Sequence, residues 1–234
     1  MRVAIVTVGD ELLAGQIVNT NASWLAEQLT ERGCRVERIT TVPDRIEAIA
    51  ELVAEYRSAY DAVVVTGGLG PTPDDVTIAA VARAVDRELT HHEAAHKWFT
   101  DNGGYTATDV DDSTTELPAG GQLLPNEVGA APGVVVDSVY VLPGIPSEMK
   151  AMFAAVAEEF TGEPTYTETV VVDEPESALL DRLAEVAEQF EVRVGSYPGE
   201  TVRVKLSGAD PDVVSAAANW FEARAGVVSA DHEQ

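Results

Sequence analysis

The sequence predicts an α/β protein with a mostly parallel sheet, followed by a small α+β domain. Three observations predict this organisation: continuous β-branched runs that suit strands buried on both faces, apolar residues at helical spacing between those runs, and a change of pattern after residue 163. Alternating strands and helices of this kind place helices on both faces of a parallel sheet. We therefore expect domains at 1–163 and 164–228, with a frayed tail at 229–234.

The first expected domain begins with the apolar run 3–8, which ends in Gly9 and Asp10 and is typical of a buried parallel strand. A helix should follow at 22–31, with Asn21 as its N-cap and Gly33 just after its end. The remaining expected elements are strands at 36–41 and 62–66, helices at 45–56 and 75–85, a long polar loop at 101–113, strands at 134–137 and 139–142, and a helix at 147–160.

The second expected domain is recognised by its different order of elements. Residues 167–172 alternate like a strand, and 176–190 repeat apolar residues like an amphipathic helix. Strands at 192–194 and 202–206 and a helix at about 212–225 complete a β-α-β-β-α order. This order indicates a small α+β domain.

Acidic residues outnumber basic ones by 40 to 15, which gives a formal net charge of −25. Self-repulsion of this kind destabilises a compact chain in dilute buffer, whereas salt at 1 M shortens the Debye length to about 3 Å. We therefore expect a salt-adapted protein, and equal stability without added salt would contradict that expectation. The same charge argues against nonspecific nucleic-acid binding, which depends on basic patches. It leaves room for a small phosphorylated ligand held by backbone amides and a metal.

The expected cellular location follows from what the sequence lacks. No apolar run approaches the roughly 18 residues that span a bilayer, and the apolar start turns glycine-rich and acidic too soon for a signal peptide. Cys34 is the only cysteine, which excludes an intramolecular disulfide and a thiolate metal cluster. We expect a cytoplasmic protein without a membrane partner, in which Cys34 is a buried thiol.

The strongest local feature is the stretch 66–77, TGGLGPTPDDVT, between an expected strand and an expected helix. Its glycines expose backbone N–H groups and let a phosphate approach, at the carboxyl end of a strand where open α/β sheets bind ligands. The pattern is neither Gly-x-Gly-x-x-Gly nor a Walker loop, so a classical dinucleotide or ATPase site is not indicated. Asp74 and Asp75 beside such a cradle favour Mg²⁺, which takes one or two carboxylates plus substrate phosphates. The alternative is a tight turn in which one of the two caps the helix.

Further blocks accompany this loop in a fixed order: GDELLAGQIVNTN at 9–21, NEVGAAPG at 126–133, LPGIPSEMK at 142–150 and GSYPG at 195–199. Together they resemble the CinA (competence/damage-inducible protein A) family over residues 1 to about 226. The glycine loop more loosely resembles that of the MoaB/MogA molybdopterin family. CinA proteins often have Thr at the position of Asp10, whereas molybdopterin enzymes often have Asp. The resemblance implies a three-layer molybdopterin-binding-like domain, without the family's C-terminal nicotinamide-mononucleotide deamidase domain and its activity.

The resemblance also implies roles for individual residues. Asp75, and with it Asp74, would act through a divalent metal (Mg²⁺, Mn²⁺ or Co²⁺), with Asp10 or Glu11 on the opposite wall. A second loop would bind an anion or a ring, and three asparagines would hydrogen-bond ribose or pterin, although turn formation and helix capping explain these asparagines equally well. The implied phosphate residues are Thr66, Gly67, Gly68, Gly70 and Thr72; the second loop contains Gly144, Pro146 and Ser147 with Glu148 nearby; the asparagines are Asn19, Asn21 and Asn126.

A competing pattern is HEAAH at 92–96, which fits the His-Glu-x-x-His spacing of zinc proteases. Thr90 could cap the helix that carries His92 and His96. No cysteine is available as a third ligand, and the only later histidine is His232 in the tail. An exposed helix with chance spacing therefore explains this pattern better than a protease does.

Three functions remain open at this level. The first is a metal-dependent pyrophosphatase acting on ADP-ribose or a related nucleotide, as the CinA resemblance implies. The second is a molybdopterin-binding protein or an adenylyltransferase-like factor in molybdenum cofactor biosynthesis, with molybdopterin as ligand. The third is a non-catalytic binding module. In each, the partner is a small-molecule nucleotide or pterin phosphate, and a homo-oligomer is expected because related domains form dimers or trimers.

Overall fold

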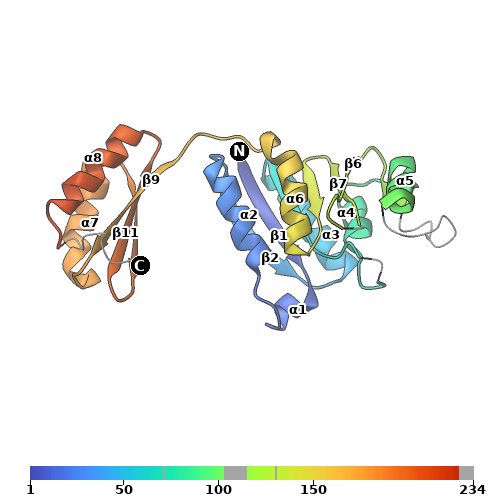
Figure 1. Ribbon diagram of the computed structural model, residues 1–234, viewed down its shortest axis with the longest axis horizontal. Coiled ribbons are helices and arrows are strands. Elements are labelled where there is room, and N and C mark those ends of the chain that lie inside the picture. The colour runs from blue at the N-terminus through green and yellow to red at the C-terminus, as the bar shows by residue number, and fades with distance from the viewer. Residues whose placement is uncertain (71, 103–114, 130, 227–234) are drawn as a thin grey trace. The chain divides into compact units, whose positions relative to one another are not determined.

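A computed structural model gives the architecture of the chain and describes residues 1–70, 72–102, 115–129 and 131–226 (Figure 1). The chain divides into two compact units, Met1–Gly162 and a second unit from Glu163 onward. The sequence had placed this boundary one residue later. Each unit has its own apolar core.

The first unit is built on a six-stranded sheet with the order β2-β1-β3-β8-β7-β6. The four strands from β2 to β8 run parallel, and β7 and β6 pair antiparallel beyond them, so the expected mostly parallel sheet is confirmed. The strands are β1 (Arg2–Val8), β2 (Arg35–Val42), β3 (Ala62–Thr66), β6 (Gln122–Leu124), β7 (Gly133–Val136) and β8 (Val139–Leu142).

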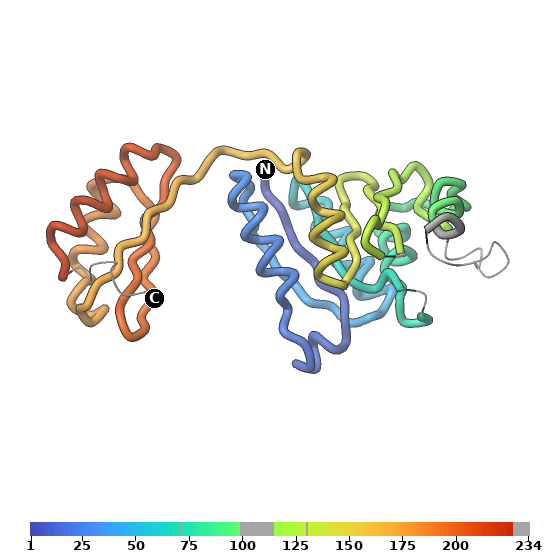
Figure 2. The backbone as a smooth tube through the Cα atoms, viewed as in Figure 1, coloured from blue at the N-terminus to red at the C-terminus, as the bar shows by residue number. Residues whose placement is uncertain are grey.

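Helices cover both faces of this sheet, because its central strands are apolar on both faces. On one face α2 and α6, far apart in the sequence, lie side by side (Figure 2) and pack around Leu25, Leu29 and Phe153. On the other face α3 and α4 pack around Ile49 and Val81. The helices of this unit are α1 (Asp10–Leu13), α2 (Thr20–Glu31), α3 (Ile46–Ala59), α4 (Thr77–Ala84), α5 (Glu93–Asn102) and α6 (Pro146–Val156), with a 3-10 helix η2 at Ala157–Glu159.

Several local expectations differ from the structure. The cap of α2 is Asn19 rather than Asn21, because the Asn19 side chain accepts the Ala22 N–H. The helix expected at 75–85 begins at Thr77, because Asp75 is held in the preceding turn. The short helix α1, strand β6 and a two-stranded ribbon of β4 (Leu89–His91) and β5 (Glu116–Pro118) were not expected. Most of the expected loop at 101–113 lies outside the described residues.

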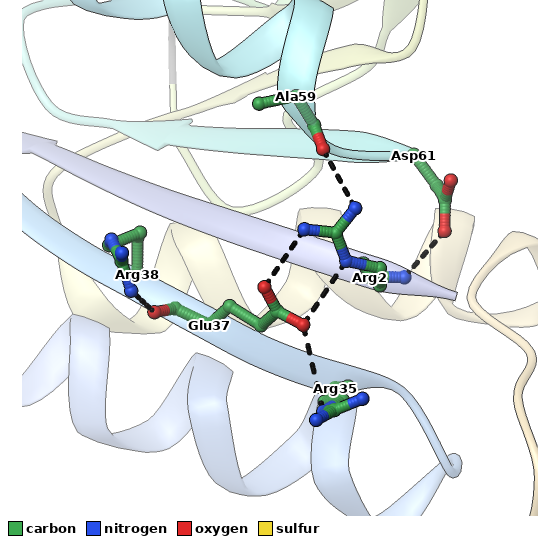
Figure 3. Close-up of polar contacts among 6 residues, drawn as sticks. All are labelled: Arg2, Arg35, Glu37, Arg38, Ala59 and Asp61. Atoms are coloured by element: carbon green, nitrogen blue, oxygen red, sulfur yellow. Dashed lines mark hydrogen bonds and ion pairs between the residues drawn. The ribbon is translucent and has the colours of Figure 1, made fainter.

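Arg2 joins three elements at the amino ends of the strands (Figure 3). Its guanidinium donates to both carboxylate oxygens of Glu37 on β2 and to the Ala59 carbonyl at the end of α3, and its backbone N–H donates to Asp61. Arg35 forms a second ion pair with Glu37. The Arg2 hydrogen bond is the main cause of the lowered pKa of Glu37. This network ties the amino ends of β1 and β2 to the end of α3, at the end of the sheet opposite the carboxyl ends of the parallel strands.

The second unit confirms the expected small α+β domain. Its antiparallel sheet has the order β10-β11-β9, and two helices pack on one face of it. The elements are β9 (Tyr166–Val172), α7 (Glu176–Phe190), β10 (Arg193–Pro198), β11 (Val202–Gly208) and α8 (Pro211–Glu222). Arg182 ties this unit together, because it pairs with Glu174 and also donates to the Arg224 carbonyl.

No helix in the described part of the chain is long and apolar enough to cross a membrane. Cys34 is buried, and burial raises the pKa of its thiol.

Candidate functional site

A cavity of about 380 Å³ opens at the carboxyl ends of the parallel strands. The chain leaves β1 towards β2 on one side, and β3 then pairs with β1 on the other side, so the cavity lies at a switch point of the strand order. Open α/β sheets bind ligands at such points because the loops diverge there. The cavity is lined by Thr7, Val8, Gly9, Glu11, Leu12, Ile17, Val18, Asn19, Thr20, Asn21, Asp44, Thr66, Gly67, Gly68, Asp74, Asp75, Gly144, Ile145 and Pro146.

The glycine loop forms the floor of this cavity. Gly67 and Gly68 both have positive φ angles, 106° and 68°, which side chains rarely tolerate. A Cβ on Gly67 would meet the Val8 carbonyl oxygen at 2.3 Å, and a Cβ on Gly68 would meet Thr77 Oγ1 at 2.3 Å. Thr66 fixes the start of the loop by donating to the Pro143 carbonyl at 2.7 Å. The Gly67 N–H donates to the Leu142 carbonyl at 3.1 Å, so close backbone contacts on both sides fix this part of the loop.

One wall of the cavity carries Asp74 and Asp75. The Thr72 hydroxyl and N–H both donate to Asp75 Oδ2, which holds the turn before α4 in place. Hydrogen bonding by Thr72 also lowers the pKa of Asp74, which favours the charged form of that carboxylate. The structure places Gly70 and Thr72 in this turn but outside the cavity lining.

Glu11 and Asp44 also line the cavity, from the connections that follow β1 and β2. Burial raises the pKa of Asp44, and the charges of Glu11, Asp10 and Asp74 raise it further, against the lowering effect of the Asp10 N–H, which donates to Asp44 Oδ2 at 2.7 Å. Asp10 is exposed outside the lining, so Glu11 rather than Asp10 reaches the cavity. Sequence reasoning missed Asp44, although it follows the end of an expected strand, as Asp10 does.

An apolar rim lies beside the acidic walls. Ile17, Val18 and Ile145 are large apolar side chains that are 57%, 80% and 57% exposed. All three line the cavity, together with Leu12 and Pro146. This half of the cavity therefore offers an apolar surface to a flat ring.

The three asparagines differ in their positions. Asn19 is fully engaged, because its Nδ2 donates to Thr7 Oγ1 and its Oδ1 caps α2. Asn21 donates from Nδ2 to the Gly144 carbonyl at 2.7 Å, while its Oδ1 is buried with no partner among the described residues. Both line the cavity, whereas the buried Asn126 does not.

Asn126 belongs instead to a separate polar cluster at the start of α6. It donates to Glu148 Oε2 at 2.7 Å and to the Ala131 carbonyl at 2.9 Å, and it accepts the Gly129 N–H. Ser147 is exposed outside the cavity lining. The structure therefore brings Gly144 and Pro146 of the second loop to the cavity, but not Ser147, Glu148 or Asn126.

The histidine pair of the HEAAH pattern lies at the start of α5, and neither histidine lines the cavity. His92 Nδ1 accepts the Ala95 N–H at 3.3 Å, so His92 rather than Thr90 caps this helix. The ring of His96 packs against that of His91, with 5.6 Å between centroids. Within the described residues, no group of three or more His, Cys, Asp or Glu side chains is arranged to hold a metal ion.

The same finding limits the metal chemistry of the cavity. A site closed by protein ligands alone is not formed by the described residues, whereas Mg²⁺ commonly uses one or two carboxylates and completes its shell with water and substrate phosphates. Asp74 and Asp75 supply hard oxygen donors of this kind beside the glycine loop. The donor set therefore fits a sparse, substrate-completed metal site.

The chain belongs to the family described as "Probable molybdopterin binding domain", whose model matches residues 4–162. Residues 164–231 match the model described as "FAD synthase, middle domain". The two matches meet at the boundary between the two compact units.

Individual relatives show which members of this family the chain resembles. A protein of Archaeoglobus fulgidus is 38% identical over 224 residues, which cover 95% of this chain and 97% of the relative. A Pyrococcus abyssi protein is 35% identical over 96% of this chain and 97% of its own length. The crystal structure of CinA from Thermoplasma acidophilum, a protein of unknown function, has a TM-score of 0.64 and 33% identity to this chain, over 69% of this chain and 99% of that chain. The CinA resemblance is thereby confirmed.

Proposed function

We propose that this protein is a divalent-metal-dependent pyrophosphatase acting on ADP-ribose or a related nucleotide. One observation carries the proposal: Glu11, Asp44, Asp74 and Asp75 line one cavity with the glycine loop, and none of the described residues that line it is Lys or Arg. A diphosphate would add negative charge to an already negative site, so a cation must accompany it. The apolar rim would take the base of the nucleotide.

The residues that line the cavity would have separate roles in this reaction. The backbone N–H of Gly68 would hold one phosphate and stabilise the charge that develops on it in the transition state, because the Gly67 N–H already donates to the Leu142 carbonyl at 3.1 Å. Asp74 and Asp75 would hold the metal, which when bound polarises a P–O bond and lowers the pKa of water. Glu11 and Asp44 would orient the attacking water. Water adds to one phosphorus atom, the bridging P–O bond breaks, and AMP and ribose 5-phosphate leave while a proton passes to solvent.

The test is AMP release from ADP-ribose, FAD and ATP by the full chain in KCl solution, with and without Mg²⁺, Mn²⁺ or Co²⁺. We expect metal-dependent AMP release from ADP-ribose or FAD. Asp75→Asn should lower it about 100-fold or more, because the loss of a metal-binding carboxylate removes several kcal/mol of transition-state stabilisation. Glu51→Gln is the matched control, because it removes one exposed carboxylate on α3 away from the cavity lining.

Unchanged turnover in a folded Asp75→Asn protein would refute the metal role of Asp75. Absence of turnover with every substrate and metal would refute the pyrophosphatase. Circular dichroism of each variant separates both results from unfolding.

The family match and the apolar rim support a second candidate, a protein that binds molybdopterin or adenylylates it. The glycine loop would hold the pterin phosphate, and Ile17, Val18 and Ile145 would contact the ring. Tight molybdopterin binding without AMP release from any dinucleotide would favour this candidate. Ligand affinity that is indifferent to divalent metal would instead indicate a binding module without catalysis.

A further inference from the structure

The second unit has one sheet face that its helices do not cover. Alternate residues of the three strands, including Val170, Val204 and Leu206, point into the core shared with α7 and α8. The residues between them therefore point to the opposite, open face. Strand register places these outward residues in three rows: Tyr197, Arg203 and Val171; Gly195, Lys205 and Thr169; Arg193, Ser207 and Thr167.

This open face concentrates positive charge. It carries Arg193, Arg203 and Lys205, all exposed, and its three rows contain no Asp or Glu. No ion pair within the described residues involves any of the three. The whole chain has 15 basic and 40 acidic residues, so a face with three cations and no carboxylate differs from the average charge of the chain.

The carboxylates in the described part of this unit lie outside the three rows. Glu191 and Glu200 stand in the connections at the two ends of β10, outside the three rows. The helices on the covered face are acidic, with only Arg182 as a cation. They carry Glu176, Asp181, Glu185, Glu188, Asp212 and Glu222. The unit is thus acidic on its helical side and basic on its open sheet face.

An aromatic ring lies on the same face. A Cβ on Gly195 would meet the Tyr197 ring at 2.9 Å and its hydroxyl at 3.0 Å, so this ring folds back over the bare glycine. Tyr197 remains 52% exposed beside Arg203, its neighbour across the strands. A ring held against a sheet and open to solvent is a surface on which a nucleobase can stack.

The spacing of the cations fits an extended polyanion. Arg203 and Lys205 are two residues apart on one strand, which is about 7 Å, and Lys205 is about 7–8 Å from its diagonal neighbour Arg193. The three therefore form a track across the face, with Tyr197 beside one end.

We propose that this open face, defined by Arg193, Arg203, Lys205 and Tyr197, binds single-stranded nucleic acid. The cations contact successive phosphates and Tyr197 stacks on a base. An acidic polypeptide would use the cations but gain nothing from the ring, and a duplex would keep its bases from stacking on it. This surface is additional to the cavity of the first unit and does not depend on the function proposed there.

The net charge of −25 does not oppose such binding at moderate salt. The Debye length is about 10 Å at 0.1 M salt, so charges on the helical side are largely screened from a ligand on the sheet face. The composition predicted no nucleic-acid binding because it averages over faces that the fold separates.

The experiment measures fluorescence anisotropy of a labelled single strand of about 12 nucleotides with the full chain, at KCl concentrations where circular dichroism shows it folded. Neutralising three phosphates gives a slope of about −2 for log K against log salt. We expect the double variant Arg203→Gln with Lys205→Gln to weaken binding about 10-fold or more and to flatten this slope. Tyr197→Ala should weaken binding roughly 5- to 100-fold with the slope unchanged.

Two controls separate the proposal from simpler explanations. Lys205→Arg keeps the charge and should keep the affinity, and Arg83→Gln removes an exposed cation of the first unit and should change nothing. The proposal is overturned if the folded chain does not bind the strand, or if the double variant binds as the parent does. It is also overturned if polyglutamate competes as well as the oligonucleotide and Tyr197→Ala has no effect, because the partner is then an acidic polypeptide.

Discussion

In the first unit carboxylates gather at the carboxyl ends of parallel strands, whereas in the second unit cations gather on the open face of an antiparallel sheet. Glu11, Asp44 and Asp75 come from three separate connections and meet only because parallel strands end at one edge. Arg203 and Lys205 meet because alternate residues of one strand share a face. Net charge therefore predicts neither site, because strand topology decides which charged side chains become neighbours.

The strongest test of this comparison measures both activities on a variant of each site. Asp75→Asn should lower metal-dependent AMP release about 100-fold or more and leave oligonucleotide affinity within about 2-fold. The Arg203→Gln, Lys205→Gln protein should show the reverse pattern. Both activities are measured on each protein by AMP assay and anisotropy. Loss of both activities in either variant would mean that the two sites are coupled.

Gly67→Ala tests whether the floor of the cavity requires a bare backbone. The positive φ of Gly67 and the 2.3 Å contact of a Cβ with Val8 should cost about 2–5 kcal/mol of unfolding free energy, measured by urea titration. Gly15→Ala is the matched control, because Gly15 also has a positive φ but nothing within 4 Å of a Cβ. It should cost about 1–2 kcal/mol. Equal costs would show that the close approach at Gly67 is relieved by local movement.

Salt should raise the stability of the fold but lower the affinity of the basic face for an oligonucleotide. KCl should raise the thermal unfolding temperature of the chain, because it screens the repulsion among the excess carboxylates. The same KCl should weaken oligonucleotide binding at the basic face. A titration of both quantities over one KCl series checks this, and an unfolding temperature that does not depend on salt would contradict the expected salt adaptation.

The smallest effect is expected at acid pH in the second unit. A hydrogen bond from Arg182 is the main cause that lowers the pKa of Glu174 from its ordinary value of 4.5 to about 2, and a hydrogen bond from the Gly226 N–H is the second cause. A carboxyl whose folded pKa is lowered contributes stability that is present above its unfolded pKa, so this contribution is lost as pH falls from about 4.5 to about 2. Thermal unfolding of Glu174→Gln should be less pH-dependent than the parent over this window. Glu188→Gln, an exposed carboxylate on α7, should keep the parental pH dependence.

Much of the first unit could be predicted from its sequence, because its strands are long apolar runs and its loop is rich in glycine. The positions of Gly67, Gly68, Asp74 and Asp75 in one cavity follow from that loop alone. Asn126 and Glu148 were associated with the ligand but pair with each other outside the cavity lining, because the buried Asn126 amide donates to the Glu148 carboxylate in the first turn of α6. No local pattern distinguishes these two arrangements.

The sequence by itself determined the alternation of strands and helices, the glycine-rich turn after β3 and the excess of negative charge. These depend on periodicity and on residues a few positions apart, where backbone preferences are fixed locally. Only the tertiary structure decided that Asp44 and Asp74 line the same cavity and that Arg193 shares a face with Arg203. Such pairings depend on strand order and register, which are set by the packing of distant segments and therefore leave no mark on the neighbouring sequence.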